Sequence, residues 1–186
     1  MKTHQDWTAR FLAEPTVLGV ADTYGIELLP PIREGRRQSQ MGKKGKSNHR
    51  WIVGGQRGLV RNPCGLVTNG DWATANGPDS HFQPLVRHWE GRRSVLTDTG
   101  FHAPDGDPPN MKICPRGTWN VRLVIETVLS LLTRVCHFKH MAHRVWESLA
   151  AHLALSMTAF NLLAQWPGLI PDEQGFVHLS MAHFSL

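Results

Sequence analysis

Four residues of this chain have the types and spacing that phosphoryl-transfer chemistry requires: Asp22, Asp98, Arg122 and Glu126. Each aspartate ends an apolar run, and Arg122 precedes Glu126 by four residues, which puts both on one face of a helix. A site for two divalent ions about 3.5–4 Å apart needs several carboxylate oxygens from separate elements. The three acids are therefore candidate ligands of Mg²⁺ or Mn²⁺. Arg122 is a candidate for holding a phosphate or orienting the glutamate.

Spacing alone also fits purely structural roles for these residues. Aspartates at strand ends often cap turns, and a glutamate on a helix is often solvated. Arg122 and Glu126 would then form a surface ion pair that stabilises the helix by roughly 0.3–0.5 kcal/mol. The choice between these interpretations depends on the elements that carry the residues.

Four segments have the β-branched and aliphatic composition of strands. They are residues 16–29, 51–59, 66–72 and 94–101. The turn sequence NPCG at 62–65 joins the second to the third and predicts an antiparallel hairpin. Asp22 is thus expected within one strand and Asp98 within another.

Three segments are predicted to be helical: a short one over 80–90, with Asp79 or Ser80 as its N-cap, and long ones over 120–137 and 142–166. The first long helix has an apolar stripe of 3.6-residue period and carries Arg122 and Glu126. Pro167-Gly168 ends the second, and the tail over 175–186 fits either a short strand or docked coil. This order of strands and helices predicts a mixed α/β fold.

Composition sets further limits. The chain has 186 residues, 41% of them hydrophobic and 19% charged, which predicts a single globular domain over 1–186. Its net charge of +5 fits a phosphate-rich partner. The three cysteines are far apart, which favours free thiols in a reducing compartment over a disulfide scaffold. Since no segment resembles a signal peptide or a membrane span, we expect a soluble intracellular protein without a membrane partner.

Residues 33–50 form a strongly basic run, REGRRQSQMGKKGKSNHR, with the single acid Glu34. The run lacks apolar periodicity and is predicted to be a loop. Cations in such a loop follow a DNA backbone without reading bases, although a solvated linker explains many charge runs equally well. The candidate DNA contacts in the run are Arg33, Arg36, Arg37, Lys43, Lys44, Lys46 and Arg50.

Four stretches of the sequence resemble one known family. They are VADTYGIEL around Asp22, HRWIVGG with GLVTNGDWATANGPDSHF, VLTDTGFHA around Asp98, and WNVRLVIETVLSLL around Glu126. In order and spacing they are similar to the DDE transposases of bacterial insertion sequences, in the group with a Tyr-x2-Arg-x3-Glu-x6-Lys signature. The similarity runs from residue 16 to residue 163, which is most of the chain.

The resemblance implies an RNase H-like fold, in which a mixed sheet lies against helices and gathers its acids at one edge, followed by C-terminal helices. It implies that Asp22, Asp98 and Glu126 hold two Mg²⁺ or Mn²⁺ ions for the cleavage and strand transfer of DNA. The expected substrates are double-stranded transposon ends and target DNA, held by a homodimer. The expected location is the bacterial cytoplasm, on the nucleoid when the protein is bound to DNA.

The chain departs from the family pattern in three respects. The signature tyrosine position is Trp119, which lacks the hydroxyl. The lysine position is Thr133, and the neighbouring Arg134 is the candidate substitute for its phosphate contact. Relatives carry a longer region before the first aspartate for recognising transposon ends, whereas 21 residues precede Asp22 here. We therefore expect the catalytic part of a longer protein.

Two alternative functions stay open on the sequence: an inactive, truncated DNA-binding remnant of a transposase, and a stand-alone RNase H-like nuclease. Asp105 and Asp107 are rival acids near Asp98, but their GDPP context favours a turn. A further cluster of Cys136, His137, His140 and His143 does not have the spacing of a zinc finger.

Overall fold

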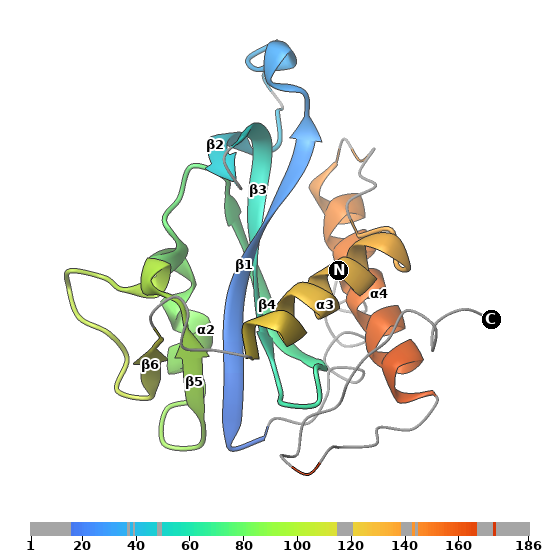
Figure 1. Cartoon of the computed structure of the whole chain (residues 1–186). Coiled ribbons are helices and arrows are strands. Elements are labelled where there is room, and N and C mark those ends of the chain that lie inside the picture. The colour runs from blue at the N-terminus through green and yellow to red at the C-terminus, as the bar shows by residue number, and fades with distance from the viewer. Residues whose placement is uncertain are drawn as a thin grey trace.

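The structure is a computed structural model that describes residues 16–36, 38, 40–47, 50–114, 121–138, 143, 145–166 and 173, with the backbone alone for 121–126. The described residues form a mixed α/β fold, in which helices flank a six-stranded sheet (Figure 1). Within these residues, no helix has the length and apolar character needed to cross a membrane.

Two long strands form the centre of the sheet. β1 (Leu18–Leu29) and β3 (Arg50–Arg61) pair antiparallel along most of their length. The other edge of β3 pairs with β2 (Lys43–Ser47) at its start and with β4 (Val67–Thr74) over the rest, both antiparallel. Apolar and β-branched residues dominate the central strands, as expected of strands covered on both faces.

The second edge of β1 carries the parallel part of the sheet. β5 (Ser94–Thr97) pairs parallel with β1, and β6 (Met111–Ile113) pairs parallel with β5. The order is therefore β2-β3-β1-β5-β6, with β4 also on β3. The β1–β5 ladder ends at the pair Val20–Leu96.

Helical segments connect and cover the strands. In chain order they are η1 (Pro31–Arg33), η2 (Asp79–Phe82), α2 (Gln83–Arg87), η3 (Thr99–Phe101), α3 (Val121–Arg134) and α4 (Trp146–Gln165). Figure 1 shows α3 and α4 on one side of β1, and α2 on the other side with β5 and β6.

Consecutive residues of β3 belong to two different apolar cores, one on each face of the sheet. Leu59 packs with apolar residues of α3 and α4, whereas Val60 packs with residues of η2, α2 and η3. Because successive side chains of a strand point to opposite faces, β1 divides in the same way. Ile26 belongs to the α3–α4 core, and Ala21 belongs to the α2 core.

Asn161 fixes α4 to the sheet. Its side chain is fully buried, its Oδ1 accepts a hydrogen bond from the Val67 amide at 2.9 Å, and its Nδ2 donates to the Val67 carbonyl at 2.8 Å. Val67 lies at a register shift of the β3–β4 ladder. The amide side chain therefore satisfies the two backbone groups of a buried strand residue, which would otherwise cost roughly 1–3 kcal/mol each.

The predicted strands at 16–29, 51–59 and 66–72, the hairpin at 62–65 and both long helices are confirmed, with shifted ends. Residues 43–47 were predicted to be loop and instead form β2. Polar composition did not prevent strand formation there, because the backbone of β2 pairs with β3. Gly45 also permits a close approach, since a Cβ at this position would meet the Ala75 carbonyl.

Other predictions need correction around the second half of the sheet. The strand predicted over 94–101 ends at Thr97, and η3 follows it. β6 was not predicted, because three residues carry too little periodicity. The helix predicted over 80–90 is divided into η2 and α2, and neither Asp79 nor Ser80 is the N-cap, which is Pro78. The three cysteines are free thiols, as predicted. Pro167-Gly168 and the tail over 175–186 lie outside the described residues.

Candidate active site

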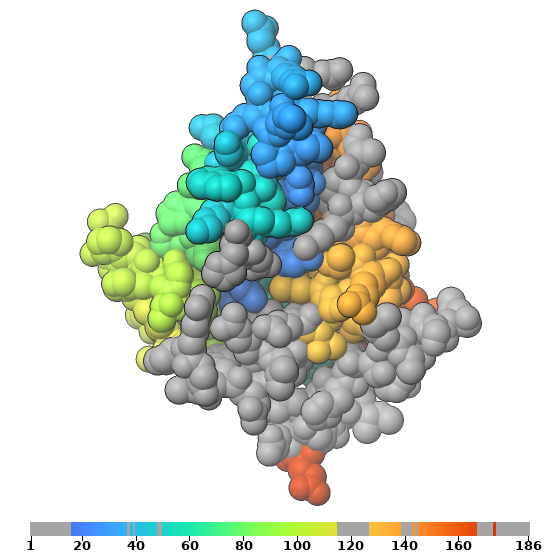
Figure 2. All heavy atoms as spheres, turned by 45° about the horizontal axis from the view of Figure 1, so that its top comes forward, coloured from blue at the N-terminus to red at the C-terminus, as the bar shows by residue number. Residues whose placement is uncertain are grey.

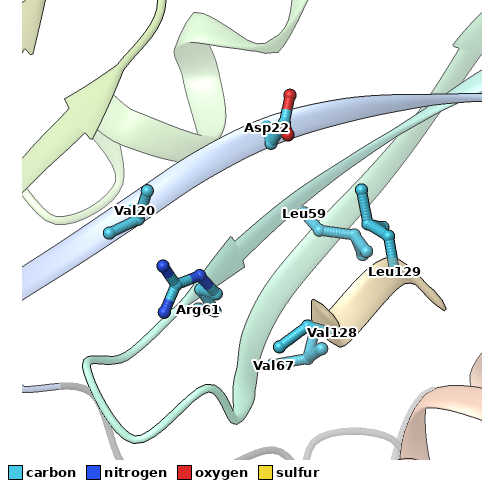
Figure 3. A pocket seen from close by; sticks show the side chains of 7 residues that line it. All are labelled: Val20, Asp22, Leu59, Arg61, Val67, Val128 and Leu129. Carbon is cyan, nitrogen blue, oxygen red and sulfur yellow. The ribbon is translucent and has the colours of Figure 1, made fainter. Parts of the chain in front are cut away.

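Asp22 lies in the middle of β1, on the face that packs against α3. The even-numbered Val20 and Ile26 share this face, and the Asp22 carboxylate is half-buried. Its Oδ1 accepts a hydrogen bond from the Thr23 amide at 2.7 Å. Asp22 borders a small hollow between β1, the end of β3 and α3 (Figure 3). The lining residues of this hollow are Val20, Asp22, Leu59, Arg61, Val67, Val128 and Leu129.

Asp98 follows directly after β5 and is the N-cap of η3. Its Oδ1 accepts a hydrogen bond from the Gly100 amide at 3.0 Å. The structural role expected of an aspartate at a strand end is therefore confirmed for this residue. A carboxylate has two oxygens and about four acceptor positions, so one capping bond is compatible with metal coordination as well.

The parallel ladder relates the two aspartates to each other. Its last pair is Val20–Leu96, and Asp22 and Asp98 each come two residues later. Paired residues of parallel strands share a face, and neighbouring strands lie about 4.8 Å apart. Asp98 itself follows the end of β5, so it lies just beyond this ladder, at the end of the strand next to β1. Of these two predicted site residues, Asp22 thus lies within β1, and Asp98 directly follows the strand that pairs with β1.

Arg61 is a charged residue of this hollow that the sequence did not single out. It ends β3 and is 3% exposed, and its Nη1 donates to the Asn62 carbonyl at 3.2 Å. Burial lowers the pKa of the Arg61 guanidinium to about 10, and the Asp22 carboxylate opposes this shift. Asp22 therefore provides part of the charge compensation for a buried cation. The available signal was an arginine within the apolar run GLVRN.

Asp79 is the second residue that the sequence did not assign to the site. It lies in η2 on the other face of β1, where its Oδ1 accepts a hydrogen bond from Thr23 Oγ1 at 2.9 Å. Burial raises the pKa of Asp79, the negative charge of Asp98 raises it further, and the bond from Thr23 lowers it. Asp79 is thus close enough to Asp98 for the two charges to interact.

Helix α3 carries the remaining predicted acid. The backbone of Arg122 and Glu126 is helical as predicted, but their side chains lie outside the described residues, as does Trp119. Leu129, three residues after Glu126, borders the hollow beside Asp22. The helix that carries Glu126 therefore packs over the strand that carries Asp22.

The donor atoms of this site suit a hard divalent cation. Asp22 and Asp98 offer carboxylate oxygens, which Mg²⁺ and Mn²⁺ prefer over nitrogen or sulfur. Among the side chains that the structure describes, no three from Asp, Glu, His and Cys gather closely enough to hold a metal ion. The predicted third ligand, Glu126, is not among them.

The described basic residues of the 33–50 run lie on a projection formed by η1 and the β2–β3 hairpin (Figures 1 and 2). Those with described side chains are all exposed: Arg33, Arg36, Lys43, Lys44, Lys46 and Arg50. Arg37 lies outside the described residues, and Arg134 is exposed in the last turn of α3.

Two of these cations have acidic neighbours. Lys44 Nζ lies 3.6 Å from Glu34, and Arg50 Nη2 lies 3.5 Å from Glu27. Such exposed pairs contribute roughly 0–1 kcal/mol, so both cations remain accessible to a phosphate. Lys44 Nζ also lies 5.6 Å from the ring centroid of Trp51, which is 59% exposed. The projection therefore combines positive charge with an accessible aromatic ring.

Asp107 has a structural role in the loop after η3. Its carboxylate accepts hydrogen bonds from the Ala103 amide at 3.1 Å and from Gln83 Nε2 at 3.0 Å, and it lies 2.8 Å from His102 Nδ1. The bond with His102 is the main reason why the pKa of Asp107 is lowered. The turn predicted for this segment is confirmed.

Comparison of the chain with protein-family models, curated proteins and solved structures gave no match.

Proposed function

We propose that this chain is the catalytic domain of an insertion-sequence transposase that cuts and joins DNA strands with Mg²⁺ or Mn²⁺. One observation carries the proposal. The parallel ladder between β1 and β5 ends two residues before Asp22 and two residues before Asp98, so one acid of the resembled motif lies in β1 and the other directly follows its neighbour β5. A mixed sheet with helices on both faces also supports the RNase H-like fold that this motif implies.

The residues of the chain have separate roles in this proposal. Asp22 and Asp98 hold the metal ions together with Glu126, whose helix packs over Asp22. When bound, the two ions activate the attacking oxygen and stabilise the leaving oxygen. Arg122 is one helical turn before Glu126 and binds the phosphate or orients the carboxylate. The acids thus position the ions, and the bound ions would neutralise the negative charge of the reacting phosphate.

Substrate binding is assigned to the basic projection and to the end of α3. The exposed cations of the 33–50 run contact the backbone of transposon-end or target DNA without reading its sequence. Arg134, exposed beside the position of the signature lysine, is a further phosphate contact. A homodimer is the proposed working form, because strand transfer requires two ends to be held together, and the bacterial cytoplasm is the proposed location.

The test is Mn²⁺-dependent nicking of a labelled DNA duplex at low salt, so that backbone contacts are not screened. We expect the wild type to nick the duplex and Asp98→Ala to lose the activity. The matched control is Asp105→Ala, which removes an exposed acid of the following loop and should nick at the wild-type rate. Wild-type protein that binds DNA and never nicks it would contradict the proposed enzyme and favour the inactive remnant.

A second assay separates transposase from nuclease. Incubation of pre-cut transposon ends with a supercoiled target should give covalently joined products if the chain transfers strands. Hydrolysis without joining would favour the stand-alone nuclease.

A further inference from the structure

The residue after Asp22 connects β1 to η2, the segment that lies beside the turn carrying Asp98. Thr23 points to the face of the sheet opposite Asp22, where its Oγ1 donates a hydrogen bond of 2.9 Å to Asp79 Oδ1. Thr23 and Asp79 are 56 residues apart in the sequence. Since Asp22 and Thr23 are consecutive, a bond that fixes Thr23 also restrains the backbone of Asp22.

The second oxygen of Asp79 lies at the Asp98 turn. A Cβ added to Gly100 would lie 2.7 Å from Asp79 Oδ2 and 3.2 Å from Asp98 Oδ1. The two carboxylates therefore border the same glycine, whose amide donates to Asp98 Oδ1 at 3.0 Å. Asp79 thus bonds to β1 through one oxygen, and its other oxygen lies close to Gly100 of η3.

The usual explanation for an acid at this position does not apply to Asp79. An aspartate at the start of a helical turn commonly caps it, but η2 has Pro78 at the N-cap and no side-chain capping bond. Asp79 is instead partly buried beside Asp98, a residue of like charge. A capping role therefore does not account for the bond that Asp79 makes to Thr23 of β1.

We propose that Asp79 and Thr23 form a positioning pair that holds the Asp98 turn against β1 and so sets the position of the Asp98 carboxylate relative to that of Asp22. The inference rests on the proposed function, because it concerns the geometry of the same acids. Outer residues that orient the ligands of a metal typically change metal affinity or activity by about 10–100-fold when they are replaced.

The test compares Thr23→Val, which keeps the side-chain shape without the hydroxyl, with the conservative variant Thr23→Ser. Three quantities are measured: Mn²⁺ affinity by calorimetry, the nicking rate at saturating DNA, and the dissociation constant for DNA. Thr23→Val should weaken Mn²⁺ binding and slow nicking, each by about 10-fold or more, with unchanged DNA affinity. Thr23→Ser should restore both to near the wild-type values.

Gly100→Ala tests the proximity of Asp79 to the Asp98 turn by a change in η3. The added methyl must displace the Asp79 or Asp98 carboxylate, so Mn²⁺ affinity should fall here as well. The matched control is Gly77→Ala, where the added Cβ would have its nearest contact at 3.4 Å from the Thr74 carbonyl. That variant should bind Mn²⁺ like the wild type.

The outcomes distinguish the two proposals. If the wild type binds Mn²⁺ and nicks DNA, and Thr23→Val does the same, the positioning pair is contradicted and the proposed function stands. The inference is equally contradicted if Thr23→Val lowers only the melting temperature, since that result means a purely structural bond. Wild-type protein that neither binds Mn²⁺ nor nicks DNA overturns the proposed function, and the inference with it.

Discussion

The hydroxyls of Tyr24 and Thr133 lie 2.7 Å apart and connect strand β1 to helix α3. Thr133 Oγ1 also lies 2.7 Å from the Leu129 carbonyl, to which it donates its single hydrogen, so Tyr24 is the donor in the bond between the two side chains. Tyr24 is two residues beyond Asp22, and Thr133 is seven residues beyond Glu126. The position that carries lysine in the resembled signature therefore holds α3 against β1 in this chain.

This bond predicts coupling between the two residues in folding stability. Tyr24→Phe and Thr133→Val should each lower the free energy of unfolding by about 1 kcal/mol, because each removes the same partly buried hydrogen bond. The double variant should lose little more than either single one, which gives a coupling energy of about 1 kcal/mol in a double-mutant cycle measured by urea unfolding.

Thr158→Val is the matched control for that cycle. The Thr158 hydroxyl donates to the Ala154 carbonyl at 2.9 Å within α4, so it makes a local helix bond of the same kind. Combined with Tyr24→Phe, it should be additive. Additive effects for Tyr24→Phe and Thr133→Val would contradict the connection between β1 and α3.

The two central aspartates should differ in their contribution to stability. The Asp22 carboxylate partly compensates the buried Arg61 guanidinium, whereas the charge of Asp98 raises the pKa of the neighbouring acid Asp79. Asp22→Asn should therefore lower the free energy of unfolding, because it removes a negative charge that partly compensates the buried Arg61 guanidinium. Asp98→Asn should leave it unchanged or raise it.

Chemical denaturation of the wild type and both variants without metal measures the difference in the free energy of unfolding. In the nicking assay, both variants should be inactive. Equal destabilisation by the two substitutions would show that Asp22 does not stabilise Arg61.

Local patterns in the sequence predicted the elements whose periodicity is long. β1, the β3–β4 hairpin and the two long helices follow from runs of apolar residues, and Asp22 and Asp98 were found because each ends such a run. β2 and β6 depend on their pairing with β3 and β5, so their own polar or very short sequences do not indicate them.

Some parts of the candidate site could not be predicted, because they depend on contacts between residues that are far apart in the sequence. The local sequence around Asp79 suggests the N-cap of a helix. Only the hydrogen bond between Asp79 and Thr23 shows that Asp79 lies beside β1. Arg61 follows the apolar residues Leu59 and Val60 at the end of β3, and its relation to Asp22 depends on the register of β1 against β3. Tyr24 and Thr133 are 109 residues apart, which no local pattern relates.

The basic projection predicts a salt-dependent affinity for DNA. Lys44→Ala and Lys46→Ala should each weaken binding similarly for all DNA sequences and reduce the slope of log K against log salt by about 1, because each lysine that contacts a phosphate displaces a counterion. Fluorescence anisotropy with a labelled duplex over a series of salt concentrations measures this slope.

Lys112→Ala is the matched control for the projection. Lys112 is also exposed, but it lies on β6, at the opposite edge of the sheet from β2. Its removal should leave the slope unchanged. Equal effects of Lys44→Ala, Lys46→Ala and Lys112→Ala would indicate a response to net charge alone and would contradict a DNA-binding role for the projection.

The raised pKa of Asp79 predicts that Asp79→Asn stabilises the protein in a pH-dependent way. Burial and the charge of Asp98 make the folded protein hold the Asp79 proton more tightly than the unfolded chain does, where the pKa is near its ordinary value of 3.8. The folded state is therefore favoured below that value, and this contribution is lost as the pH rises through the raised pKa. Asparagine has no charge to bury and still accepts the bond from Thr23.

The melting temperature of Asp79→Asn should thus equal that of the wild type at the acidic end of the range and exceed it at pH 7.5. Differential scanning calorimetry of both proteins from pH 3.5 to 8 measures the difference. Asp105→Asn, which neutralises an exposed carboxylate of the nearby loop, should follow the wild type throughout. A difference between Asp79→Asn and the wild type that stays constant with pH would mean that burial beside Asp98 does not destabilise the Asp79 carboxylate.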